Sequence, residues 1–305
     1  MAKYSKILAW IVSIIALLAI IAAGLGVFWQ GSDPHTIFVT QRGQTVDIQG
    51  SGLYKYDSVS LASQGIAQDV VTLFMGVPLL LISLWLYQKS LLRGKLMLAG
   101  TLAYFLYTYI LYAFNTAFNV LFLDYVALSS LSLFAFILTL MSVDVAGLPE
   151  HFTGKLPRKS IITFLFISAS FLLVAWLGRI VPAYFDNKPP VGLENATTLG
   201  IQVMDLGLIV PVGYLGGYLL LKRSAWGYLI SAIMLFKVFT LGTALCAMII
   251  GQFIAGVEMA LVEVIIFPLL ALAGIVLTLL LLINLKEARV GESVNERPAE
   301  LILQK

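Results

Sequence analysis

Lys237 is the residue whose type and position most strongly indicate chemistry. It lies about eleven residues into an apolar run at 226–250, near the middle of a segment long enough to cross a bilayer. A charged side chain at that depth costs about 2.5–3.5 kcal/mol on insertion scales, so it usually faces a partner or water. Asp205 and Glu263 lie at a compatible depth in the neighbouring runs. The sequence therefore predicts a buried charge cluster in which Lys237 pairs with Glu263 or Asp205, in either a functional or a structural role.

Hydroxyl and amide side chains form a second pattern. They follow spacings of four, four, three and four residues, and they are Tyr104, Thr108, Tyr112, Asn115 and Asn119. These spacings place them on one face of a helix. Asp124 follows in the next apolar run, and Gln68 and Asp69 come near the start of an earlier one. We expect these side chains to line a polar cavity that faces outward; the alternative is hydrogen bonding between packed helices.

Two prolines and a set of repeated landmarks indicate a duplication. Pro78 and Pro211 each follow a valine near the middle of an apolar run and lack an amide donor, so we expect a break in each helix. The landmarks Asp69, Pro78, Gly94 and Tyr104 recur as Asp205, Pro211, Gly227 and Lys237 when three residues are dropped after the Asp. The two aspartates would then open equivalent helices, where the helix dipole favours a carboxylate. We predict a parallel duplication of a four-helix unit, against the alternative of a chance match.

Composition indicates the fold class. Hydrophobic residues make up 60% of the 305 residues, charged residues make up only 11%, and the mean hydropathy is +0.96. A soluble domain carries about 25% charged residues, so we predict an all-α, polytopic membrane protein. Eight transmembrane helices are expected, at 7–28, 66–88, 96–117, 120–142, 160–183, 200–221, 226–250 and 257–284. The first is longer than the apolar core of a signal peptide, so we expect it to be retained.

The basic residues predict the orientation. With eight spans, fourteen of the nineteen Lys and Arg residues fall on the side that holds both ends of the chain. Four fall on the other side, Arg179 among them, and Lys237 lies in the membrane. Because short loops follow the positive-inside rule, we expect both termini in the cytosol of a prokaryotic cell and the protein in the plasma membrane.

The domain organisation follows from these spans. We expect a first four-helix unit at 1–148, a second at 159–285, and a flexible cytosolic tail at 286–305. The first unit includes an outer loop at 30–65, in which two short β-like runs flank a turn at 41–44. This loop is either a small hairpin over the outer face or a loosely packed connector.

Several kinds of site are excluded by the residues present. Cys246 is the only cysteine, and the two histidines, His35 and His151, fall in loops on opposite sides, so we predict neither a metal site nor a haem cofactor in the membrane. The signatures of hydrolases, metalloproteases, P-loop ATPases and dinucleotide-binding domains are missing. The net charge of +3 is spread over many loops, so no nucleic-acid partner is expected.

These observations predict a transporter or permease-like protein. Its two units would enclose an outward-facing polar cavity, in which Lys237 and its carboxylate partner handle a small-molecule or ion substrate. The bilayer is the only other expected partner. The alternative is a membrane-embedded enzyme, a sensor or an assembly subunit with a ligand or partner site at the outer face. The sequence identifies neither the substrate nor the oligomeric state.

Overall fold

The structure is a computed structural model that describes residues 4–186 and 188–287, and it is mostly helical. Eight helices within these residues are long and apolar enough to cross a membrane. Six of them are single elements: α1 (Ser5–Phe28), α4 (Leu92–Asn115), α5 (Phe122–Leu140), α6 (Arg158–Asp186), α9 (Ala225–Ile254) and α10 (Leu261–Ile283). The other two are α2 (Val59–Val71), η1 (Thr72–Gly76) and α3 (Val77–Gln88), and α7 (Gly200–Met204), η3 (Asp205–Ile209) and α8 (Val210–Leu221).

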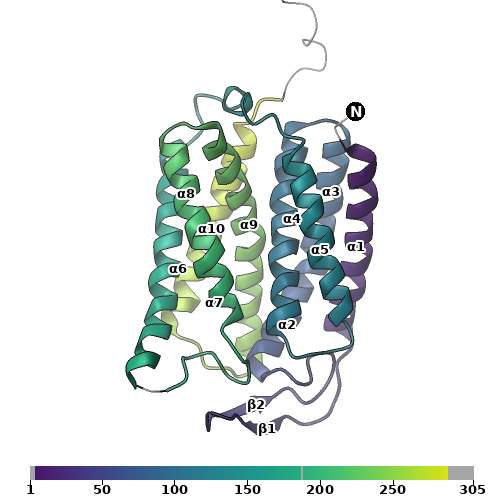
Figure 1. Ribbon diagram of the computed structural model, residues 1–305, viewed down its shortest axis with the longest axis vertical. Coiled ribbons are helices and arrows are strands. Elements are labelled where there is room, and N and C mark those ends of the chain that lie inside the picture. Colours follow the sequence, from purple (N-terminus) through teal and green to yellow (C-terminus); the bar gives the residue numbers. More distant parts are fainter. Residues whose placement is uncertain (1–3, 187, 288–305) are drawn as a thin grey trace, which may run out of the picture.

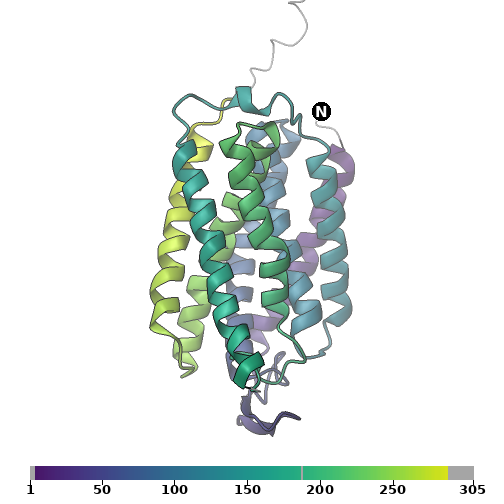
Figure 2. The same cartoon turned by 60° about the vertical axis from the view of Figure 1, so that its left-hand side comes forward.

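The helices form two groups that lie side by side. Figure 1 shows α1 to α5 in one group and α6 to α10 in the other. The buried apolar side chains form two clusters, one mainly in each group, and the second cluster also includes Leu96 and Tyr107 of α4. The groups meet where α2 and α4 pack against α9, and where α7 approaches α4. Figure 2 gives a second view of the bundle, in which α6 and α8 lie in front. The contact between the groups is therefore a seam formed by few helices.

The two ends of the bundle differ. One end carries the strands β1 (Thr36–Val39) and β2 (Thr45–Ile48), which pair antiparallel with Thr36 opposite Ile48, and it is called the hairpin end below. The opposite end carries the loops at 89–91, 141–157 and 222–224, with the short 3₁₀ helix η2 (Leu148–His151), and it is called the terminal end. The chain enters and leaves the described residues at the terminal end.

The helix containing Asp69 starts earlier than the sequence predicts. It begins at Val59, because the Ser58 side chain accepts a hydrogen bond from the Leu61 amide at 3.1 Å and so caps the first turn. The expected start near 66 was wrong. It was placed too late because the first two turns carry polar side chains, which face a cavity between the two groups of helices. Asp69 consequently lies deep inside the span, and the interpretation that it opens a helix is also wrong.

Both expected proline breaks lie directly after a turn of π-helix. The five residues of η1 precede Val77 and Pro78, and the five residues of η3 precede Val210 and Pro211. In η1 the Val77 amide reaches back to the carbonyl of Thr72, and in η3 the equivalent bond goes to Asp205. The wider π-turn accommodates the proline, whose backbone nitrogen has no hydrogen to donate. The helices therefore continue through the proline instead of ending there.

The two interrupted spans also end alike. Ser90 and Arg223 both have positive φ angles, of 61° and 57°, in the turn that follows. A Cβ atom on Gly94 would lie 2.3 Å from the backbone nitrogen of Tyr87, and one on Gly227 would lie 2.3 Å from that of Leu220. These features are separated by a constant 133 residues. At that spacing Asp205 corresponds to Thr72, where η1 and η3 begin, so the sequence alignment of Asp69 with Asp205 does not match the structure.

Candidate functional site

A cavity of about 440 Å³ lies between the two groups of helices. The first group contributes α2 and α4 to its wall, and the second contributes α6, α7, η3, α9 and α10. On α9 the lining residues extend from Gln252 near the hairpin end down to Met234, well into the span. Loop residues at 191–194 and 257–260 also line it, so the cavity reaches the hairpin end. It is mostly apolar, with a few polar side chains at defined positions.

Lys237 lies at the deep end of this cavity. Its side chain is only 5% exposed, and its ammonium nitrogen lies 3.8 Å from the centroid of the Tyr107 ring. This is a cation–π contact across the seam, since Tyr107 belongs to α4 and Lys237 to α9. The ammonium makes no ion pair and donates no hydrogen bond to any residue that the structure describes. Its three donors are thus left for whatever occupies the cavity.

Asp205 lines the same cavity as Lys237. The two side chains are not in direct ion-pair contact. Instead, the Tyr107 hydroxyl donates to Oδ1 at 2.7 Å, and the Trp176 indole N–H donates to Oδ2 at 2.9 Å. Tyr107 therefore contacts both charges, through its ring face and its hydroxyl. Asp205 lies on η3, and the π-turn places it on the cavity wall.

Glu263 does not join this cluster, which corrects part of the expected pairing. It lines the same cavity nearer to the hairpin end and forms an ion pair with Arg179 of α6. The Arg179 guanidinium also lies 5.2 Å from the centroid of the Trp176 ring. From the sequence, Arg179 was counted with the basic residues of the outer side, although the expected span at 160–183 contains it; α6 extends beyond it to Asp186. Arg179 thus lies within the span and pairs with Glu263, one of the two partners expected for Lys237.

The polar stripe on α4 is divided between cavity and packing. Gln68 and Thr108 line the cavity, and the Gln68 amide donates to the Tyr104 hydroxyl at 2.6 Å and to Thr108 Oγ1 at 3.2 Å. Tyr104 is buried behind them and lies 2.8 Å from Thr72 Oγ1. At the 133-residue spacing, Tyr104 and Thr72 correspond to Lys237 and Asp205. The first unit thus holds a neutral hydrogen-bonded pair where the second holds two charges.

Asp69 lies outside the cavity lining. It is 1% exposed, and both of its oxygens accept hydrogen bonds from tyrosines, Tyr54 at 2.5 Å and Tyr112 at 3.0 Å. Tyr112 also lines the cavity and contacts the carbonyl of Gly65. Among the described residues Asp69 has no cationic partner. It is a sealed carboxylate inside the first group.

The remaining members of the predicted lining are not at the cavity either. Asn115 accepts a hydrogen bond from the Gly200 amide at 3.1 Å and so joins α4 to α7. Asn119 accepts one from the Leu121 amide at 2.9 Å in the turn before α5. Asp124 lies in the first turn of α5, where its Oδ2 has no hydrogen-bond partner among the described residues. Asn115 and Asn119 thus hold neighbouring backbone segments by hydrogen bonds, in line with the alternative interpretation of the stripe.

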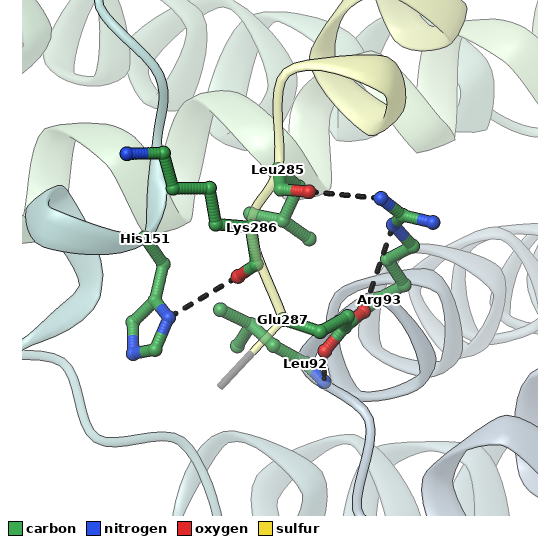
Figure 3. Close-up of polar contacts among 6 residues, drawn as sticks. All are labelled: Leu92, Arg93, His151, Leu285, Lys286 and Glu287. Carbon is green, nitrogen blue, oxygen red and sulfur yellow. Dashed lines mark hydrogen bonds and ion pairs between the residues drawn. The ribbon is translucent and has the colours of Figure 1, made fainter. Parts of the chain in front are cut away.

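The terminal end is closed by packing and by a short crossing segment. Beyond Met234 the α9 side chains enter the apolar core of the second group. Figure 3 shows the segment that follows α10, where Glu287 accepts hydrogen bonds from the amides of Leu92 at 2.7 Å and Arg93 at 3.0 Å. Arg93 also donates to the carbonyl of Leu285 at 2.9 Å. Glu287 therefore ties the second group to the first turn of α4.

Three site residues were missed by the sequence interpretation: Tyr107, Trp176 and Arg179. Tyr107 lies one turn from Tyr104 on the same helix, and its spacing of three residues from it was an available signal. Trp176 and Arg179 are likewise one turn apart within the expected span at 160–183, but the sequence does not show that their side chains meet Asp205 and Glu263. Within 4–186 and 188–287 no group of three or more His, Cys, Asp or Glu side chains is placed to hold a metal ion.

Comparison of this chain with known protein families, with curated proteins and with solved structures finds no significant match. Its function is therefore inferred from the geometry of the cavity alone.

Proposed function

We propose that this chain is a permease-like membrane transporter whose substrate binds between its two groups of helices. The observation that carries the proposal is the cavity at the seam, which runs from the hairpin end to the buried Lys237. Sites at the interface between repeated units, with charged groups near the middle of the membrane, are typical of transporters. The terminal side of Lys237 is packed and bridged by Glu287, so the conformation corresponds to one step of an alternating-access cycle.

We further propose that the hairpin end faces outward. Ten of the fifteen basic residues that the structure describes lie in the loops of the terminal end or in the adjoining helix turns and chain segments, as the positive-inside rule requires of a cytosolic face. Both ends of the chain are then cytosolic, and the membrane is a prokaryotic plasma membrane. In this orientation the cavity is open toward the outside.

A duplication of a four-helix unit is the third part of the proposal. It is supported by the π-turns before Val77 and Val210, by the twelve-residue helices α3 and α8, and by the matching φ angles of Ser90 and Arg223. The units would be parallel, related by an axis along the membrane normal. Rocking of one unit against the other at the seam would expose the cavity to the second side.

A sensor or partner-binding role is the second candidate, and one observation favours it. A polar cavity of about 410 Å³ lies at the hairpin end, between β2 and the loops that include Glu194 and Glu258. The Ser58 hydroxyl contacts Glu194 there, which joins the start of α2 to the loop before α7. A ligand bound at that position would report on both groups of helices without passing between them.

Cysteine accessibility distinguishes the two roles. The experiment uses a Cys246→Ser background, so that a single introduced cysteine is the only thiol. Met248→Cys samples the cavity nearer to the hairpin end, and Met234→Cys samples its deep end. Vesicles of each orientation are treated with a membrane-impermeant thiol reagent. A transporter predicts labelling of Met234→Cys from both sides, because the units alternate.

Ser132→Cys is the matched control, since Ser132 is fully buried in α5 and lies outside the cavity. It should resist the reagent in both kinds of vesicle. Labelling of Met234→Cys from the hairpin side alone, under all conditions, would contradict transport and would leave a fixed pocket that suits a sensor.

A further inference from the structure

The ammonium of Lys237 is poorly supplied with acceptors for a buried charge. Lys237 is only 5% exposed and lines the cavity. It donates no hydrogen bond to any residue that the structure describes. Buried polar groups in proteins are nearly always hydrogen-bonded, and a charged group in a membrane span even more so. An acceptor supplied from the cavity would complete the site.

Asp205 does not supply that acceptor. Each of its oxygens is held by a donor from another helix, the Tyr107 hydroxyl or the Trp176 indole, and neither reaches ion-pair distance of Lys237. The carboxylate balances the charge of Lys237 at a distance. The ammonium donors stay available while the pair remains neutral overall, which lowers the cost of keeping Lys237 in the span.

Polar side chains, among them the ion-paired Arg179 and Glu263, line part of the wall between Lys237 and the hairpin end. The rest of this wall is apolar and is formed by Leu111, Leu172, Leu241, Leu245, Phe267 and Leu270, which come from α4, α6, α9 and α10. A ligand that places an acceptor at Lys237 must therefore lay a hydrocarbon portion along these side chains. A cavity of this size and character suits a small amphipathic molecule.

We propose that the cavity binds an apolar organic acid, whose carboxylate accepts hydrogen bonds from Lys237 and whose hydrocarbon chain packs against this wall. Glu194 and Glu258 line the cavity at the hairpin end, so a cationic amphiphile is the competing ligand. The ammonium at the deep end argues against a cationic ligand, because such a ligand would provide no hydrogen-bond acceptor for Lys237. This inference rests on the proposed function and names the substrate class of the same cavity.

Binding of hexanoate tests the inference without any transport step. The purified protein in lipid nanodiscs is titrated at pH 7 with hexanoate, hexanol and hexylammonium, which share one alkyl chain. Saturable heat of binding and a rise in melting temperature are expected for hexanoate, with at least tenfold weaker binding of the other two. Equal or tighter binding of hexylammonium would overturn the proposal.

Three variants locate the binding. Lys237→Met should weaken hexanoate binding at least tenfold, whereas Lys237→Arg should retain it. Leu245→Trp fills the apolar wall and should weaken binding with Lys237 intact, so a failure of Lys237→Met to fold leaves the proposal testable. Unchanged hexanoate affinity in Leu245→Trp or in a folded Lys237→Met protein would overturn it.

Chain length identifies the source of the acid. Affinity that peaks near octanoate and falls at hexadecanoate would indicate a water-soluble acid, and affinity that rises throughout would indicate a fatty acid from the bilayer. Either result supports a carboxylate ligand. The cysteine experiment needs no ligand, so the two proposals can fail separately. Alternating access without hexanoate binding would refute only the substrate class. Hexanoate binding to a pocket that is labelled from one side alone would refute only transport.

Discussion

Two buried aspartates in the same membrane protein are stabilised by the same means but serve different ends. Asp69 accepts hydrogen bonds from Tyr54 and Tyr112, and Asp205 accepts them from Tyr107 and Trp176. Paired aromatic donors are an effective way to keep a carboxylate inside a span, because a carboxylate without partners is very costly there. Only Asp205 also faces the cavity and a lysine. Asp205 therefore belongs to the proposed substrate site, whereas Asp69 lies within the packing of the first group.

Gly26 makes room for Asp69, which gives the first prediction. A Cβ atom on this residue of α1 would lie only 1.7 Å from Asp69 Oδ2, so Gly26→Ala must displace the carboxylate from its tyrosine donors. We expect a loss of about 1–3 kcal/mol in the free energy of unfolding, measured by denaturation in mixed micelles. Gly24→Ala in the same helix is the control, since its Cβ would meet no atom within 4 Å. Equal stability of the two variants would contradict the packing of α1 against Asp69.

Asp57, outside the spans, gives the second prediction. Burial raises the pKa of this carboxyl from 3.8 to about 7, partly offset by the hydrogen bond from the Ala117 amide at 2.7 Å. The folded protein thus holds a proton that the unfolded chain releases near pH 4. The stabilisation is fully present below that pH and is lost as the pH rises to about 7.

We expect the free energy of unfolding to fall by on the order of 2 kcal/mol between pH 5 and pH 8 through this group alone. Asp57→Asn keeps the acceptor for Ala117 and should remove this part of the pH dependence, as followed by thermal unfolding at both pH values. Asp47→Asn, at an exposed position on β2, should leave the dependence unchanged. A pH dependence that is the same in Asp57→Asn and in the natural protein would show that burial of Asp57 has no such effect.

At the level of secondary-structure elements, the π-turns and the ends of α4 decide how the cavity is built. Each π-turn adds one residue to a helical turn, so the segment before it is rotated relative to a regular helix. In the second group the rotated residue is Asp205, which reaches Tyr107 and Trp176. Both spans with a π-turn before a proline contribute polar side chains to the cavity, Gln68 from the first and Asp205 from the second.

The first turn of α4 gives the third prediction. Its Leu92 and Arg93 amides have no partner within the helix and donate to Glu287. Glu287→Ala should lower the free energy of unfolding by about 1 kcal/mol, the usual cost of a lost N-terminal cap. If the segment also holds the terminal end closed, the same change should speed the labelling of Met234→Cys from that end.

Lys286→Ala is the control for this prediction, because Lys286 contacts His151 through backbone atoms and not through its side chain. It should match the natural residue in both measurements. A Glu287→Ala protein that is as stable and as slowly labelled as Lys286→Ala would show that the crossing segment neither caps α4 nor restrains the two groups.

At the scale of the whole molecule, the sequence allowed the membrane architecture to be predicted but not the pairing of charges. Apolar run length is a local property, so the eight spans agree with the helices that the structure shows, apart from their ends. Lys237 was correctly expected to be buried, since depth along a helix is also local. The partner of a charge depends instead on how helices are rotated and on where they end. Glu263 was assigned to the wrong cation for this reason, because it pairs with Arg179 of α6 and not with Lys237.

The seam between the two groups supplies the last prediction. Tyr107 of the first group donates to Asp205 of the second at 2.7 Å, and both side chains are buried. Tyr107→Phe removes this hydroxyl but keeps the ring that faces Lys237, so it should cost about 1–3 kcal/mol of unfolding free energy. In an Asp205→Asn background the same change should cost clearly less, which a double-mutant cycle measures as the coupling between the groups.

Tyr109→Phe on the same helix is the matched control for that cycle. The Tyr109 hydroxyl is buried and has no hydrogen-bond partner within the described residues, so its removal should cost little and should not depend on Asp205. The alternative result is a cost of Tyr107→Phe that is the same with and without the Asp205 carboxylate. The hydrogen bond would then contribute nothing to holding the groups together. The seam would depend on the apolar packing of α2 and α4 against α9 and on the other polar contacts between the groups, such as Asn115 with Gly200 and Glu287 with Leu92. A coupled hydrogen bond between Tyr107 and Asp205, beside the unpaired ammonium, would instead make the seam sensitive to an anion that enters the cavity, and would link ligand binding to the contact between the two groups.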